Sequence, residues 1–154
     1  MSSLHRIICL GNRLVREDAA GPAVYDRLQQ CQLPASLELI EGGLAGLDLL
    51  PYLEQGGRVV FVDAVSGFTD DGQVVVLDQQ DLVQQTDELV YGHDAGLPYL
   101  LTILPHVHEG VLPEEITLVG VEGAYNSAVI NEAATLSIAI ALHGNRQPRE
   151  ERQR

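Results

Sequence analysis

The sequence predicts an α/β fold with three layers, in which helices cover both faces of a five-stranded, mostly parallel, twisted sheet with one antiparallel strand. Short apolar runs alternate with segments whose apolar residues recur every three or four positions, as strands alternate with helices in a parallel sheet. Such alternation implies right-handed crossovers. One link between strands is too short for a crossover helix, which predicts the antiparallel strand. With 154 residues, 45 % of them apolar, the chain fits one globular domain.

The first half of the chain is predicted to contain three strands and two helices. A buried strand stops at Gly11, and Asp18 and Pro22 mark the start of the helix that follows. Pro51 lies inside the second predicted helix, whereas four consecutive apolar residues before Asp63 indicate the clearest buried strand. In order, these elements are strand 7–10, helix 18–30, strand 37–40, helix 47–55 and strand 58–63.

The second half is predicted to add two strands and two helices. The link 64–73, which contains Gly67 and Gly72, is the one too short for a crossover helix. A long polar segment, 78–92, then precedes a helix with Pro98 in its first turn. The elements are strand 74–77, helix 95–105, strand 116–121 and helix 128–142. We therefore expect one domain over residues 1–143 and a disordered polar tail over 144–154.

The charge is strongly acidic and unevenly distributed. The formal net charge is −13 at pH 7, yet residues 146–154 hold four of the nine basic residues. The rest of the chain therefore repels phosphate backbones and anionic lipids. We expect no nucleic acid or membrane partner, and a cationic ligand or metal fits better, although acidic surfaces also serve solubility alone.

The two cysteines and the lengths of the apolar segments indicate the cellular compartment of the protein. Cys9 and Cys31 have neither a paired spacing nor a secretory context, which indicates a reducing compartment, the cytoplasm. No stretch approaches eighteen uninterrupted apolar residues, so no targeting or membrane-spanning segment is expected. Because no spare apolar face is evident, we expect a monomer.

Three polar residues are predicted to meet at one edge of the sheet. Asp18 follows the first strand and Asp63 closes the third, and the carboxyl ends of parallel strands share one edge, where ligands bind. The last strand is parallel to these only if the helix 95–105 returns the chain from that edge. His93, two residues before this helix, should then join the two carboxylates.

Two carboxylates and an imidazole suit a divalent transition metal such as nickel, zinc, manganese or iron. Only three protein ligands would leave open positions for water or substrate, as in catalytic sites. Structural roles are the alternatives: Asp18 as a helix cap, Asp63 as a hydrogen-bonded buried acid and His93 as a helix-start histidine. Glu17 is a weaker ligand candidate.

Other constellations are less favourable. The pair His106 and His108 has alternate spacing but should lie at the opposite edge. No Gly-x-Gly-x-x-Gly motif follows the first strand, so nucleotide binding there has no support. Ser66, Ser127 and the cysteines lack the context of an activated nucleophile, which argues against covalent catalysis.

Five segments along the chain resemble the hydrogenase maturation endopeptidases. They span about residues 7–142 in the same order as in that family. The segments are Gly11-Asn12-Arg13-Leu14-Val15-Arg16-Glu17-Asp18-Ala19-Ala20-Gly21, Glu41-Gly42-Gly43-Leu44-Ala45-Gly46, Val62-Asp63-Ala64, His93-Asp94-Ala95-Gly96-Leu97 and Leu118-Val119-Gly120-Val121.

The resemblance implies an enzyme that removes a carboxy-terminal extension from the large-subunit precursor of a nickel–iron hydrogenase after nickel insertion. It assigns metal contacts, and with them the catalytic role, to Asp18, Asp63 and His93. The nickel is expected to arrive within the substrate, so the isolated enzyme is expected to bind metal weakly or not at all.

Three departures from the family pattern affect the substrate-facing loops and not these three residues. Cys9 stands where glycine is usual, Ala19 replaces a common glycine after the second acid, and the segment after Gly120 matches only loosely. The hydrogenase class served is therefore left open.

Rival functions come from other classes of protein. A receiver-type signalling domain needs a lysine after the fifth strand, and the nine basic residues of this chain are all arginines. A small-molecule metallohydrolase would bind metal tightly without a protein partner. A non-catalytic metallochaperone would bind a hydrogenase precursor and leave its length unchanged.

Overall fold

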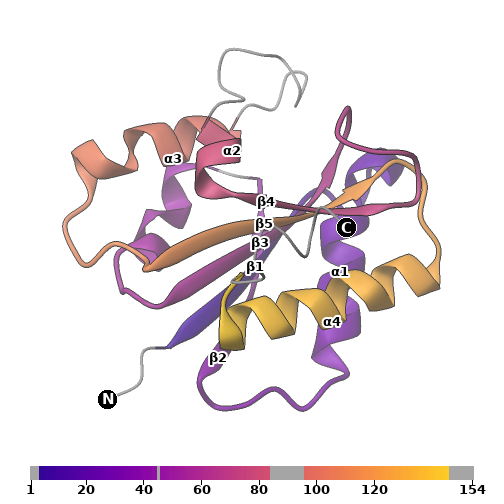
Figure 1. Cartoon of the computed structure of the whole chain (residues 1–154), viewed down its shortest axis with the longest axis horizontal. Helices are drawn as coiled ribbons and strands as arrows, with labels where there is room; N and C mark the ends of the chain where they lie inside the picture. Colours follow the sequence, from indigo (N-terminus) through magenta and orange to yellow (C-terminus); the bar gives the residue numbers. More distant parts are fainter. Residues whose placement is uncertain (1–3, 45, 84–95, 146–154) are drawn as a thin grey trace.

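The computed structural model describes residues 4–44, 46–83 and 96–145. They form a three-layer structure around a five-stranded sheet in the order β2-β1-β3-β5-β4 (Figure 1). β1, β2, β3 and β5 are mutually parallel, and β4 pairs antiparallel with β5. The predicted fold class, including its one antiparallel strand, is confirmed.

The described elements follow the predicted order. The strands are β1 (His5–Leu10), β2 (Leu37–Gly43), β3 (Arg58–Val65), β4 (Val74–Asp78) and β5 (Glu115–Glu122). The α-helices are α1 (Ala20–Gln29), α2 (Gln79–Val83), α3 (Gly96–Val107) and α4 (Ser127–His143), and the 3₁₀ helices are η1 (Arg16–Asp18) and η2 (Leu47–Leu53).

Each face of the sheet carries its own apolar core, because successive side chains of a strand point to opposite faces. On one face, Ile7, Val60 and Val119 pack among residues of α1 and α4. On the other, Ile8 and Phe61 pack among leucines of η2, α2 and α3. Figure 1 shows α1 and α4 on one side of the sheet and α2 and α3 on the other.

One close contact ties the first helix to the sheet. A Cβ atom on Gly21, in the first turn of α1, would lie 1.8 Å from the carbonyl oxygen of Leu10. Only glycine therefore lets α1 begin so close to the end of β1. This contact positions the loop between β1 and α1, which carries Asp18.

Three local predictions are wrong. The segment predicted as an α-helix over 47–55 is a 3₁₀ helix, and it contains Pro51, which lacks the amide donor an α-helix uses. The short helix α2 lies in the long polar segment 78–92, where no helix was predicted. β3 does not end at Asp63 but at Val65, because β5 continues to pair with it up to Glu122.

The two described residues after α4 are held slightly beyond the predicted domain end. The backbone amide of Asn145 donates to the Glu115 carboxylate at 2.8 Å, and the amide of Gly144 donates to the Ile140 carbonyl at 2.7 Å. The remainder of the predicted tail, 146–154, lies outside the described residues. In the part of the chain that is described, no helix is long and apolar enough to cross a membrane.

Candidate active site at the carboxyl edge of the sheet

Asp63 is a buried carboxylate on a central strand. It lies in β3 opposite Gly120 of β5, and it is 8 % exposed. Its Oδ1 accepts a hydrogen bond from the backbone amide of Ala64 at 2.8 Å. A buried charge requires such polar partners. The strand therefore holds this carboxylate in a fixed position near the carboxyl edge of the sheet.

Asp18 lies at the end of η1, in the loop that leaves β1. The amide of Asn12 donates both to the Asp18 carbonyl at 2.9 Å and to its Oδ2 at 3.0 Å. The N-cap residue of α1 is Ala19, so the capping position predicted for Asp18 falls one residue later. The Asp18 carboxylate instead closes the loop onto the end of β1.

The fold brings these two acids to the same edge. Cys9 of β1 pairs with Val62 of β3, so the residues after each lie side by side. A Cβ atom on Gly11 would lie 2.2 Å from the Asp18 carbonyl oxygen, which shows how tightly Asp18 packs over the end of β1. η1 also contacts β3 directly. The predicted convergence of Asp18 and Asp63 therefore agrees with the geometry.

The third predicted ligand, His93, lies outside the described residues. Within the described ranges, no group of three histidine, cysteine, aspartate or glutamate side chains could hold a metal ion. The two aspartates offer the oxygen ligands that divalent cations accept, and an imidazole is a common third ligand. The metal assignment therefore stays a prediction.

An arginine clamp beside Asp18 was not predicted. Arg13 donates to both carboxylate oxygens of Asp26 at 2.9 Å and to Glu41 at 2.5 Å, and its guanidinium stacks over Tyr25. These hydrogen bonds raise the pKa of Arg13 above its usual range and lower the pKa of Asp26. The clamp joins the Asp18 loop to α1 and β2. It joins residues far apart in sequence, so no local motif could have revealed it.

A second carboxylate, Glu122, organises the loop after β3. It ends β5, is 5 % exposed and accepts backbone hydrogen bonds from Gly67 at 3.0 Å, Phe68 at 2.8 Å and Thr69 at 3.1 Å. This loop leaves the strand that carries Asp63. Glu122 therefore orders the loop that follows the Asp63 strand, although the sequence did not single it out.

The alternative metal pair is at the other edge, as predicted. His108 follows α3, and its Nδ1 lies 3.0 Å from the Gly110 carbonyl oxygen. The next residue along, Val111, bridges to Gln55, just before β3 begins. His106 and His108 are thus near the amino ends of the strands, whereas Asp63 lies near the carboxyl end of β3.

The cysteines are free thiols, and Cys9 is unsuited to nucleophilic chemistry. Cys9 is fully buried in the core, and burial raises the pKa of its thiol far above the usual range. A protonated, inaccessible thiol does not attack a peptide bond. Cys9 is therefore not a candidate nucleophile.

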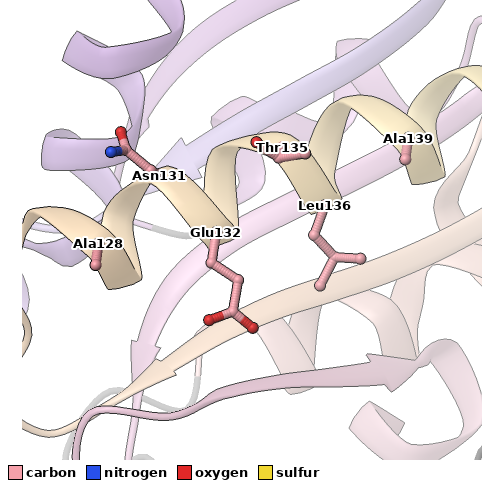
Figure 2. Close-up of a pocket in the computed structure, with 6 residues that line it drawn as sticks. All are labelled: Ala128, Asn131, Glu132, Thr135, Leu136 and Ala139. Carbon is pink, nitrogen blue, oxygen red and sulfur yellow. The ribbon is translucent and has the colours of Figure 1, made fainter.

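A shallow pocket lies on the outer face of α4 (Figure 2). Its lining residues all come from that helix: Ala128, Asn131, Glu132, Thr135, Leu136 and Ala139. Asn131 already accepts a hydrogen bond from Arg27 of α1. The pocket holds one carboxylate and contains neither Asp18 nor Asp63, so it is not the candidate site.

The sequence matches a known family over well more than half of its length. Residues 22–138 match the hydrogenase maturation protease family. The matched range contains Asp63 and begins four residues after Asp18. The hydrogenase 2 maturation protease of Escherichia coli (strain K12) is 29 % identical over 117 residues, which span 75 % of this chain and 70 % of that protein.

Solved structures share the fold. The hydrogenase maturating endopeptidase HybD from E. coli superposes with a TM-score of 0.77 at 24 % identity, covering 91 % of this chain and 93 % of the other. An endopeptidase from Escherichia coli, solved in solution, gives a TM-score of 0.71 at 26 % identity, covering 95 % and 99 %. The family match, the curated relative and the shared sheet agree, and the chain belongs to the hydrogenase maturation protease family.

Proposed function

We propose that this protein is an endopeptidase that removes the carboxy-terminal extension of a [NiFe]-hydrogenase large-subunit precursor after nickel has been inserted. The observation that carries the proposal is the pair of carboxylates, Asp18 and Asp63, at one edge of a fold shared with maturation proteases. We infer that the reaction takes place in the cytoplasm, in keeping with the two free thiols.

In this proposal, Asp18, Asp63 and His93 bind the nickel that the precursor carries. Bound nickel would supply Lewis-acid polarisation of the scissile carbonyl or of the attacking water. The contribution of the chain is to hold the precursor so that its last folded segment lies against the carboxyl edge. The buried position of Asp63 limits water around the charge, which strengthens its electrostatic interactions. Nickel counts here as part of the substrate, so the purified protein need not retain it.

The test is to measure the intact mass of a nickel-loaded large-subunit precursor after incubation with the purified protein. We expect loss of a carboxy-terminal peptide with the wild-type protein and none with Asp63→Asn or Asp18→Asn. The neutral amides keep the shape of the side chains but remove the charge that binds the cation. Nickel-free precursor is expected to stay intact.

Glu132→Gln is the matched control, because Glu132 is an exposed acid on α4, outside the candidate site. Its cleavage rate is expected to stay within about twofold of the wild type, since exposed surface charges contribute little. Intact precursors from several hydrogenase classes would contradict the protease assignment. A stable complex with unchanged precursor length would favour the metallochaperone instead.

A further inference from the structure

Four large apolar side chains are exposed on the two segments that follow β1 and β2 at the carboxyl edge. Leu14 is 93 % exposed and Val15 42 %, both in the loop after β1. Leu44 is 64 % exposed and Leu47 59 %, both after β2. We call these four residues the edge patch. An exposed apolar cluster next to a candidate site marks an interaction surface more often than scattered single residues do.

The two loops are joined side by side. The amide of Gly11 donates to the Gly43 carbonyl at 2.8 Å, and Arg13 donates to the Glu41 carboxylate at 2.5 Å. β1 and β2 are neighbours in the sheet, so the loops leave the same edge in the same direction. The segments that carry the edge patch are therefore adjacent at this edge of the sheet.

The loop holds Leu14 outward in a defined turn. Its amide donates to the Asn12 side-chain oxygen at 2.9 Å, and the amide of Val15 donates to the Asn12 carbonyl at 3.1 Å. An apolar side chain gains nothing from a fixed, solvated position within its own fold. It gains when a second chain covers it.

The edge patch is contiguous with the candidate site. The same Asn12 that holds Leu14 donates its amide to the Asp18 carboxylate. Three exposed acids form an acidic rim beside the edge patch: Glu17, Glu41 and Asp48. The nearby positive charge of Arg13 is already paired with Asp26 and Glu41. The surface thus combines exposed leucines and a valine with negative charge, which complements a segment carrying apolar side chains and basic residues.

We propose that the edge patch binds the carboxy-terminal extension of the precursor as a segment of apolar and basic residues, and so selects which precursor is cleaved. This inference rests on the proposed function, because it names what the same site binds. The extension would lie across Leu14 and Leu44 while the scissile bond reaches Asp18 and Asp63. Binding by this surface affects substrate affinity more than the chemical step.

The experiment compares steady-state cleavage of the nickel-loaded precursor by the wild type, Leu14→Ser and Leu44→Ser. Burying one leucine is worth enough to change affinity roughly tenfold. We therefore expect KM to rise about tenfold in each variant, with kcat within about twofold. Added NaCl is expected to raise KM for the wild type, because it screens the acidic rim. Equal thermal unfolding midpoints would show that the variants are folded.

Val111→Ser is the matched control. Val111 is also apolar and 69 % exposed, but it lies at the opposite edge, where its amide donates to the Glu54 carbonyl. Its KM is expected to match that of the wild type. An equal rise of KM in Val111→Ser would overturn the proposal, because the effect would then not belong to the edge patch.

The remaining outcomes separate the two proposals. Unchanged KM in Leu14→Ser and Leu44→Ser, with normal cleavage, would overturn the edge patch and leave the protease intact. Absence of cleavage by the wild type would overturn the proposed function. It would also overturn the proposed binding of the carboxy-terminal extension, which depends on that function. A wild-type dimer in sedimentation velocity that Leu14→Ser dissociates would assign the patch to a second copy of the chain and overturn the proposal.

Discussion

Buried polar side chains at the strand ends are held by specific backbone partners. His5, at the start of β1, is 9 % exposed, and its Nδ1 accepts the backbone amide of Arg58 at 2.9 Å. Arg58 in turn donates to the carbonyls of Ala141 and Leu142, the last turn of α4. Through Arg58, the imidazole of His5 is thus linked both to the start of β3 and to the end of α4.

Acidification is expected to destabilise the protein through His5. Burial, followed by the positive charge of Arg58, lowers the pKa of His5 below 6.5 in the folded state. The unfolded chain therefore binds a proton more readily, so the contribution of neutral His5 is fully present above pH 6.5 and is lost as the pH falls below it. Urea unfolding at pH 7.5 and 5.5 should show a lower midpoint at pH 5.5.

The variant His5→Asn provides the comparison, because an amide oxygen can accept the same bond and does not titrate. Its midpoint is expected to change less between the two pH values than that of the wild type. An equal change in both proteins would assign the effect to the other titrating groups.

Among the elements, the loop that connects β3 to β4 is held by Glu122 of the strand between them, β5. Glu122 at the end of β5 accepts three consecutive loop amides, and the amide of Gly72 donates to its carbonyl at 2.7 Å. The loop is therefore ordered by β5 and not by its own sequence, which is rich in glycine and aspartate. Such an element keeps the end of the Asp63 strand in place.

Glu122→Ala is expected to lower the free energy of unfolding by about 2 kcal/mol, since three loop amides lose a charged acceptor. Urea denaturation measures the change, and faster amide hydrogen exchange at Gly67 and Thr69 would locate it in the loop between β3 and β4. Glu132→Ala on the exposed face of α4 is the control, with an expected change below about 0.5 kcal/mol. Equal effects in the two variants would contradict the role of Glu122.

At the scale of the whole molecule, the dominant property is negative charge. Residues 1–145 contain five arginines and twenty acids, and the isoelectric point is near 4.5. Mutual repulsion at neutral pH keeps such molecules apart, and it disappears as the net charge approaches zero. Charge repulsion then no longer opposes apolar association through the exposed leucines of the edge patch.

Solubility is therefore expected to pass through a minimum near pH 4.5 and to recover at lower pH. Turbidity measured across pH 3.5 to 7.5 tests this expectation. Measuring Leu14→Ser beside the wild type shows whether the edge patch contributes to the association. A smaller turbidity maximum in Leu14→Ser would link association to the edge patch, whereas constant turbidity across the range would contradict the charge argument.

The fold was largely predictable because its signals are local. Apolar runs marked all five strands, and the short link before β4 marked its direction. The same reasoning placed Asp18 and Asp63 at one edge. It failed for the end of β3, which depends on pairing with Glu122 of β5.

Features of the site that depend on distant contacts were not predictable. The Arg13 clamp joins positions separated by 13 and 28 residues, and no spacing rule covers such pairs. α2 was missed because its helical residues are mostly polar and the element is only five residues long. The prediction for His93 lies outside the described residues, so the third ligand stays a prediction.

The two candidate carboxylates differ in how readily local opening would displace them. Asp63 lies on a strand with a partner strand on each side, so releasing it requires disruption of the sheet. Asp18 lies at the end of η1, outside the sheet, in a segment anchored by hydrogen bonds to Asn12 and by the Arg13 clamp. Segments outside the sheet open at lower free energy than core strands. Transient fluctuation would therefore separate the pair by moving Asp18, and a bound precursor that closes this loop would assemble the site around a stationary Asp63.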